Sequence, residues 1–230
     1  MNSTQKAIFL WLFLILASLV IMGLSFRCDS VVRENIVSSQ GKGWKKAPLA
    51  KAMNAASKYG DWPELMCLGA IGLVIAWRLR SREWIKIIIA AMIASTLAGA
   101  LANTSRLTTG RPRPREAVEL GARWYGPYHE GKILIGNPRY NSFPSGHTAT
   151  AMAFVAVFLF TRPRLGILLL IPASLIAAAR MYLGAHHFSD VITSTILSFF
   201  VAWFVWEFIR KKGDSLLERF CPLTRFKENT

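Results

Sequence analysis

The stretch WIKIIIAAMIASTLAGALANT, residues 84–104, decides the class of fold. It is almost uniformly apolar and is about as long as the 20 residues that a helix needs to cross a bilayer. Within it Ala91, Ser95 and Gly99 recur at every fourth position, which places small side chains along one face. Such a face lets another helix approach closely. The stretch therefore predicts a membrane-spanning helix that packs against other helices.

Other apolar runs repeat this signal along the chain. The chain has 230 residues, 53% of them hydrophobic, and a mean hydropathy of +0.33. So many apolar runs leave too few polar faces for a soluble fold. We therefore expect an all-α fold, a six-transmembrane-helix bundle in a single domain over residues 1–230, with a polar cytoplasmic tail at 213–230. The expected spans cover residues 7–26, 62–80, 84–104, 145–162, 164–182 and 187–209.

Three further features of the sequence complete the outline. The run at 7–26 lacks a small-residue cleavage site, so we expect an uncleaved span in place of a signal peptide. Residues 47–60 are typical of an amphipathic helix, either at the membrane surface or in a soluble loop. The three cysteines stand singly and do not suggest zinc ligands, and pairing of Cys28 with Cys67 stays open.

The basic residues indicate both an orientation and a class of partner. Short segments rich in Lys and Arg are cytoplasmic, and such segments occur at 78–86, at 162–164 and at 210–212. We therefore expect both termini in the cytoplasm of a bacterial cell, a multi-pass protein of the inner membrane, and the segments 27–61 and 105–144 on the outer face. A net charge of +15 suits anionic lipids or phosphorylated substrates. Nucleic acid is not expected as a partner, because no soluble basic domain is present.

Three polar clusters adjoin the predicted spans. Residues 106–114 (RLTTGRPRP) follow the third span, residues 144–147 (PSGH) precede the fourth, and residues 180–190 (RMYLGAHHFSD) join the fifth to the sixth. Six spans place all three clusters on the same side of the membrane. We therefore expect them to form one outward-facing site.

The residue types in these clusters suit phosphate chemistry. Guanidinium groups hold phosphate oxygens in bidentate pairs, and the clusters contain Arg106, Arg111, Arg113 and Arg180. Ser145 and Gly146 begin a helix, whose free backbone N–H groups attract anions. Glycine lets a ligand approach the backbone closely.

Histidines add the reactive groups. His186 and His187 precede Asp190 by four and three residues, so either ring can meet that carboxylate across one helical turn. A carboxylate that holds one ring nitrogen makes the other a better nucleophile or base. His147 supplies a second imidazole for acid catalysis. A metal site, a surface histidine pair and a simple helix cap are the alternative interpretations of the separate motifs.

The three clusters together resemble the signature of the type 2 phosphatidic acid phosphatase (PAP2) superfamily. That signature reads K-x6-R-P, then P-S-G-H, then S-R-x5-H-x3-D. This chain has Arg106-x6-Arg113-Pro114, an intact Pro144-Ser145-Gly146-His147, and Ala179-Arg180-x5-His186-x3-Asp190. It departs from the pattern at two positions, where Arg106 replaces lysine and Ala179 replaces serine.

The resemblance implies a role for each matching residue. His186 resembles the nucleophile that forms a phosphohistidine, Asp190 its orienting partner, and His147 the general acid. The phosphate-binding residues implied are Arg106, Arg113, Ser145, Gly146 and Arg180. Arg111 is not part of the signature and is expected either to support its neighbours or to contact a second phosphate. The family uses no metal and no other cofactor.

The implied activity is hydrolysis of a phosphate monoester or diphosphate on a membrane lipid. Family members act on undecaprenyl diphosphate, lipid A phosphates, phosphatidylglycerol phosphate or phosphatidate. The same motifs also suit a lipid phosphotransferase, or a non-catalytic lipid-binding or transport protein on the same scaffold. The sequence does not specify the oligomeric state.

Overall fold

The computed structural model describes residues 2–121 and 123–220 of the chain. Cys221 and the end of the predicted tail, residues 221–230, lie outside the described residues. The helices are α1 (Ser3–Ser39), η1 (Trp44–Lys46), α2 (Pro48–Tyr59), α3 (Trp62–Arg78), α4 (Arg82–Thr109), α5 (Ala117–Leu120), η2 (Pro138–Tyr140), α6 (Gly146–Thr161), α7 (Pro163–Tyr182) and α8 (Phe188–Phe220), and a short antiparallel hairpin joins β1 (Tyr128–His129) to β2 (Lys132–Ile133).

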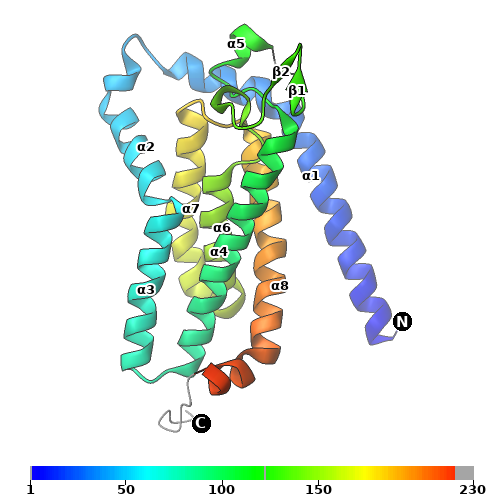
Figure 1. The fold of residues 1–230 in the computed structure, drawn as a ribbon, viewed down its shortest axis with the longest axis vertical. Coiled ribbons are helices and arrows are strands. Elements are labelled where there is room, and N and C mark those ends of the chain that lie inside the picture. The colour runs from blue at the N-terminus through cyan, green and yellow to red at the C-terminus, as the bar shows by residue number, and fades with distance from the viewer. Residues whose placement is uncertain (1, 122, 221–230) are drawn as a thin grey trace.

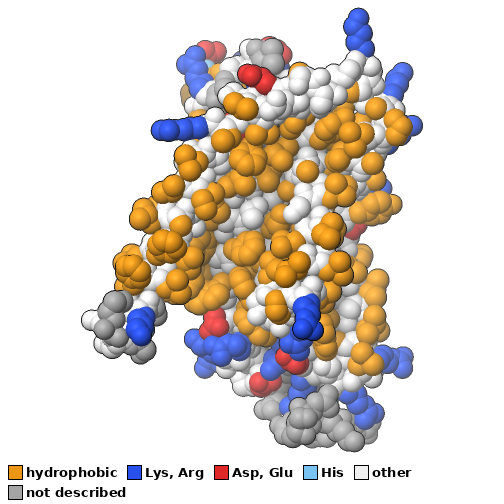
Figure 2. Space-filling model, turned by 180° about the vertical axis from the view of Figure 1, so that it is seen from behind, with side chains coloured by type: hydrophobic (Ala, Val, Ile, Leu, Met, Phe, Trp, Pro, Cys, Tyr) orange, Lys and Arg blue, Asp and Glu red, His pale blue; other side chains and the backbone are white. Residues whose placement is uncertain are grey.

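Each expected span coincides with a helix. Among the described residues four helices are long and apolar enough to cross a membrane, namely α1, α4, α7 and α8. The other two expected spans correspond to α3, with 17 residues, and α6, with 16. Hydrophobic side chains cover the middle of the bundle, and Lys and Arg side chains gather towards its ends (Figure 2). The expectation of an apolar helical membrane protein is therefore confirmed.

Helix α6 lies at the centre of the bundle, in contact with α4, α7 and α8. Its residues from Gly146 to Phe158 are buried apart from His147. Small side chains on α4 make this packing close: Ala91 and Ser95 are fully buried, and a Cβ atom added at Gly99 would lie 2.6 Å from Thr150. The small-residue face predicted from the sequence is therefore a contact between helices.

Helix α1 runs obliquely beside the bundle (Figure 1). Most of its apolar side chains are exposed, and it touches α8 through Trp11, whose ring packs edge-on against Trp203 at 4.3 Å. It is also longer than its predicted span of 7–26, because residues 27–39 contain no glycine or proline that would end a helix. The predicted outer segment 27–61 therefore begins as a helix.

One end of the bundle is covered by short elements. The helix predicted at residues 47–60 is present as α2 and packs against α7, while α5 and the β hairpin lie over the same end (Figure 1). Helix α1 begins and α8 ends at the opposite end. Cys28 and Cys67 are both free thiols, so they form no disulfide with each other.

Candidate active site

The three polar clusters meet at the covered end of the bundle. Arg106 lies in the last turn of α4, which ends at Gly110 in the left-handed region (φ 57°). PSGH leads into α6, and the segment between α7 and α8 carries both adjacent histidines. The convergence predicted from the span count is therefore present in the fold.

The N-terminus of α6 has the form expected of an anion site. Ser145 is its N-cap, and the Ser145 hydroxyl accepts from the backbone N–H of Thr148 at 3.5 Å. A Cβ atom at Gly146 would lie 2.6 Å from Nη2 of Arg106 and 3.0 Å from Oδ1 of Asn103. Glycine is therefore required where the guanidinium crosses the start of the helix.

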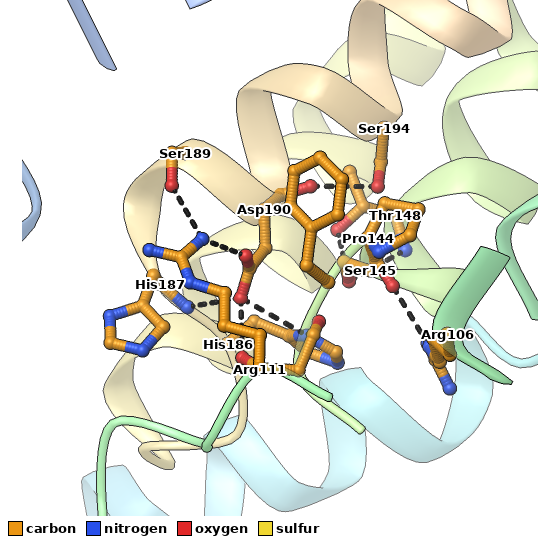
Figure 3. A network of polar contacts seen from close by, with 12 residues as sticks. Arg106, Arg111, Pro144, Ser145, Thr148, His186, His187, Ser189, Asp190 and Ser194 are labelled. Atoms are coloured by element: carbon orange, nitrogen blue, oxygen red, sulfur yellow. Dashed lines mark hydrogen bonds and ion pairs between the residues drawn. The ribbon is translucent and has the colours of Figure 1, made fainter. Parts of the chain in front are cut away.

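Arg106 uses the geometry that distinguishes arginine from lysine. Its Nε donates to the carbonyl of Pro144 at 2.8 Å (Figure 3), while its Nη2 is buried without a hydrogen-bond partner in the described structure. The Nε–H of the planar group thus anchors Arg106 to the loop before α6, and Nη2 is left to donate to a ligand.

His186 is held through one ring nitrogen, Nδ1, while its other ring nitrogen, Nε2, has no hydrogen-bond partner in the described structure. Its Nδ1 lies 2.6 Å from the carbonyl oxygen of Ser142. A carbonyl only accepts, so Nδ1 carries the proton and Nε2 carries the lone pair of the neutral ring. Within the described residues Nε2 is buried and has no partner. This is the arrangement that an imidazole nucleophile requires.

Asp190 lies close to His186 but is not the direct partner of its ring. The Asp190 Oδ2 atom is 3.7 Å from Nδ1, and it accepts instead from the Ser142 hydroxyl at 2.5 Å and from the backbone N–H of His187 at 2.8 Å. The sequence suggested direct carboxylate–imidazole contact, whereas Ser142 stands between the two groups. Its carbonyl binds the ring and its hydroxyl binds the carboxylate.

Arg111 is a hydrogen-bond and ion-pair partner of Asp190. Its Nη1 donates to Asp190 and, at 2.8 Å, to the Ser189 hydroxyl (Figure 3). Its Nη2 pairs with Asp29 of α1 at 2.6 Å. Only 4% of Arg111 is exposed. Arg111 thus contacts Ser189, Asp29 and Asp190 in the structure.

Aromatic rings enclose the same guanidinium. Its Cζ atom lies 5.2 Å from the ring centroids of Phe26 and Trp124 and 6.0 Å from that of Phe143. Asp29 also accepts from the backbone N–H and the hydroxyl of Ser189, at 2.8 and 2.7 Å. A buried ionic network thus joins α1 to the start of α8.

Unpartnered nitrogens mark the place for a ligand. Besides Nη2 of Arg106 and Nε2 of His186, the Nε atoms of Arg113 and Arg180 are buried without a partner in the described part of the chain. Burial, together with the charges of Arg106 and Arg180, lowers the pKa of His186 to about 3 against the opposing effect of Asp190. These groups therefore lie close enough to act on one another, and buried donors of this kind call for an anion.

His147 faces the same region from the first turn of α6. Its Nε2 lies 3.5 Å from Oδ2 of Asp61, the residue that caps α3 through its other carboxylate oxygen. The His147 side chain is 25% exposed, in contrast to that of His186, which is fully buried. One imidazole is therefore enclosed, and the other is open to solvent and paired with an acid.

His187 points away from this centre. Its Nε2 donates to the carbonyl of Pro112 at 3.1 Å, and burial lowers its pKa. The structure thus distinguishes the two adjacent histidines, as the signature spacing does. In residues 2–121 and 123–220, no three side chains of His, Cys, Asp or Glu are grouped so that they could hold a metal ion.

Four supporting residues were missed in the sequence. Asp29 and Asp61 bind Arg111 and His147, Ser142 joins His186 to Asp190, and the Ser57 hydroxyl accepts from Arg180 at 2.7 Å. Asp29 carried no clear signal in the sequence, because it stands near Arg27, Arg33 and Glu34 in the polar part of α1. The others depend on how segments distant in the sequence meet.

Two curated proteins are similar to this chain in sequence. The chain is 35% identical over 106 residues to the lipid A 1-phosphatase of Rhizobium johnstonii, covering 46% of this chain and 40% of that protein. It is 30% identical over 157 residues to the lipid A 1-phosphatase of Rhizobium etli, covering 64% of each. The chain thus spans less than two thirds of the length of either relative.

A solved structure has the same fold. The PAP2-type phosphatidylglycerolphosphate phosphatase from Bacillus subtilis matches with a TM-score of 0.53 and 20% identity, covering 93% of this chain and 98% of that one. The family model of the PAP2 superfamily matches residues 84–214, which include all three signature clusters. The chain belongs to the PAP2 superfamily.

Proposed function

We propose that this chain hydrolyses a phosphate group from a membrane lipid through a phosphohistidine formed on His186, without a metal ion. The observation that carries the proposal is the unpartnered Nε2 of His186, buried among arginines whose own nitrogens lack partners. A neutral imidazole with a free lone pair, surrounded by fixed cations, is suited to attack a phosphorus atom.

The first step transfers the phosphoryl group to the protein. The Nε2 lone pair of His186 forms a bond to phosphorus as the bond to the lipid oxygen breaks. His147 gives its proton to that oxygen, and the lipid leaves. In the second step water attacks the phosphohistidine, His147 takes the water proton, and inorganic phosphate departs as the phosphorus–nitrogen bond breaks.

The remaining residues stabilise the charge that develops on phosphorus. Arg106, Arg113 and Arg180 bind the equatorial oxygens, and the backbone N–H of Gly146 adds the positive end of α6. The backbone N–H of Ser145 donates to the carbonyl of Asp190 at 3.4 Å. Asp190 holds the segment that carries His186, because it accepts from Ser142 and from the backbone of His187.

We place this site at the membrane surface. In the proposal all six long helices cross the bacterial inner membrane, both termini are cytoplasmic, and the site faces outward. Charge near the span ends supports this orientation, since Arg78, Arg80 and Arg82 lie at the end opposite the site. The substrate lipid enters from the side with its head group at that surface.

Lipid A phosphate is the first substrate to test, since both curated relatives carry the name lipid A 1-phosphatase. Undecaprenyl diphosphate, phosphatidylglycerol phosphate and phosphatidate complete the panel. The measurement is inorganic phosphate released by the purified protein in detergent with excess EDTA. We expect release from one of these lipids, inhibition by vanadate, and no release by His186→Ala.

A matched control separates the nucleophile from histidines in general. His129 lies on the β hairpin, where its ring packs against Tyr125, and His129→Ala should keep the wild-type rate. Full activity of His186→Ala would contradict the assignment of the nucleophile, and loss of activity in EDTA would contradict metal independence. Labelled phosphate that appears on a second lipid in place of water would identify a phosphotransferase.

A further inference from the structure

A basic pocket adjoins the proposed phosphate site without including its nucleophile. It has a volume of about 310 Å³. Arg113 and Arg180 line it and belong to the signature, while Lys45 of η1 and Arg115 line it and do not. No acidic side chain is among its lining residues.

The fold anchors the backbone near both additional cations, whose side chains are exposed. Trp44, next to Lys45, packs edge-on against Tyr182 at the end of α7, with 5.5 Å between ring centroids. Gln40 donates to the Tyr182 carbonyl at 2.7 Å. These contacts fix the segment just before Lys45 over the end of α7.

Arg115 is fixed by its own backbone. Its N–H reaches the carbonyl of Gly184 at 3.4 Å, and a Cβ atom added at Gly184 would lie 3.3 Å from Cβ of Arg115. Gly184 has φ +64°, a conformation that favours glycine. The turn between α7 and α8 therefore accommodates Arg115 beside the pocket.

The positive charge around the pocket exceeds the negative charge of the nearby Glu116. Glu116 lies 3.3 Å from Nε of Arg115, but it also accepts from Arg139 at 2.8 Å. Burial and the neighbouring Arg115 cation lower the pKa of Arg113. Four cations around one small volume repel each other, and an anion in the pocket relieves that repulsion.

A second cavity links the same two cations to the nucleophile. It has a volume of about 150 Å³ and is lined by Lys45, Arg115 and His186, and on its apolar side by Val32 and Ile36 of α1. Lys45 and Arg115 thus stand between the reacting centre and the basic pocket. A head group with one phosphate at His186 has room for a further anionic group beside these cations.

We propose that Lys45 and Arg115 form a second anion subsite, which selects lipids whose head group carries a phosphate besides the one removed. This inference rests on the proposed function, because it places the first phosphate at His186. The second phosphate has two chemical sources. It is directly joined to the first in a polyprenyl diphosphate, or it stands at the far end of a diglucosamine lipid phosphorylated at both ends.

The test compares matched pairs of lipids. One pair is a polyprenyl diphosphate and its monophosphate, and the other is a diglucosamine lipid with phosphate at both ends and the same lipid with one. For Lys45→Gln and Arg115→Gln, we expect the ratio of kcat/KM for the doubly to the singly phosphorylated lipid to fall about tenfold in one pair. The pair that responds identifies the source of the second phosphate.

Lys46→Gln is the matched control, because Lys46 lies in the same short helix but does not line the pocket. Its ratio should equal that of the wild type. Equal losses on both members of both pairs would overturn the subsite and leave only general attraction to anionic lipid.

Binding to a His186→Ala protein separates this inference from the proposed function. That protein should hold the doubly phosphorylated lipid more tightly than the singly phosphorylated one, and adding Lys45→Gln should remove the preference. A preference that disappears in this way supports the subsite even where the wild type releases no phosphate. If the His186→Ala protein still prefers the doubly phosphorylated lipid after Lys45→Gln is added, the subsite is excluded.

Discussion

Oδ2 of Asp61 lies 3.5 Å from Nε2 of His147, so the residue that caps α3 also supplies an acid to the imidazole at the start of α6. Asp61 precedes the family match at residues 84–214. The Asp61 charge favours the protonated form of His147, which a general acid needs, and so opposes the burial and the Arg180 charge that disfavour this form.

Asp61→Asn tests whether this pairing serves proton donation. Asparagine keeps the N-cap of α3, so the fold should be retained while the negative charge is lost. We expect kcat/KM on a lipid phosphate to fall about tenfold or more, a part of the 10²–10⁴-fold that general acid catalysis contributes. On an aryl phosphate, whose leaving group needs no proton, the loss should be smaller.

The difference between the loss of kcat/KM on the lipid phosphate and the loss on the aryl phosphate shows whether Asp61 serves proton donation. Asp214→Asn is the control, since Asp214 pairs with Lys86 at the other end of the bundle. His147→Asn should show the same dependence on leaving group as Asp61→Asn. Equal losses on both substrates would mean that Asp61 acts only through the fold.

Gly146→Ala tests the close approach of Arg106 to the start of α6. A methyl group there would lie 2.6 Å from Nη2 of Arg106 and must displace it. Removing one donor to a developing anion costs about 10²–10³ in rate, and we expect a loss of that order in phosphate release. Gly23→Ala is the control, because nothing lies within 4 Å of a methyl group at that position of α1. A fully active Gly146→Ala would show that this guanidinium position is not needed.

Arg111→Met tests the buried ionic network. The substitution keeps an apolar stem among the aromatic rings but leaves Asp29 and Asp190 without their shared cation. Breaking a buried ion pair in this way costs about 3–5 kcal/mol, so the melting temperature in detergent should fall markedly. Arg123→Met should change it little, because Arg123 is exposed and its guanidinium only lies over Tyr125. Equal melting temperatures for the two variants would contradict the network.

The low pKa of His186 predicts how stability varies with pH. Burial holds its pKa at about 3 in the folded chain, whereas an unfolded histidine titrates near about 6.5. Between these values only the unfolded state binds the proton, so stability falls as pH decreases from about 6.5 towards 3. His186→Gln removes this contribution, and its melting temperature should fall less steeply over that range. Parallel curves for the two proteins would contradict the assigned pKa.

The sequence predicted the parts of the fold that composition controls. Apolar runs marked the helices because a bilayer demands about 20 apolar residues whatever their packing. The length of the first apolar run placed the end of the first predicted span at residue 26. The length of such a run reflects the thickness of the membrane and not the length of the helix. Helix α1 in fact continues to Ser39.

The residues of the site could be predicted where their side chains carry the chemistry. They could not be predicted where a backbone group carries it. His186, Asp190 and the arginines could be identified by type and spacing. The carbonyl of Ser142, which fixes the tautomer of His186, has no sequence signal because every residue has a carbonyl. The partnerships of Asp29 and Asp61 arise from the packing of α1 and α3 against the bundle, which a single sequence does not specify.

The salt bridge between Asp29 and Arg111 has a consequence for how this protein is divided into parts. By homology the enzyme-like core is residues 84–214, and α1 looks like an accessory anchor on its flank. Yet a carboxylate from that anchor completes the ionic network behind the reacting centre. A fragment trimmed to the homologous core would therefore keep every signature residue and still have an incomplete site. The smallest unit that preserves it begins within the first helix.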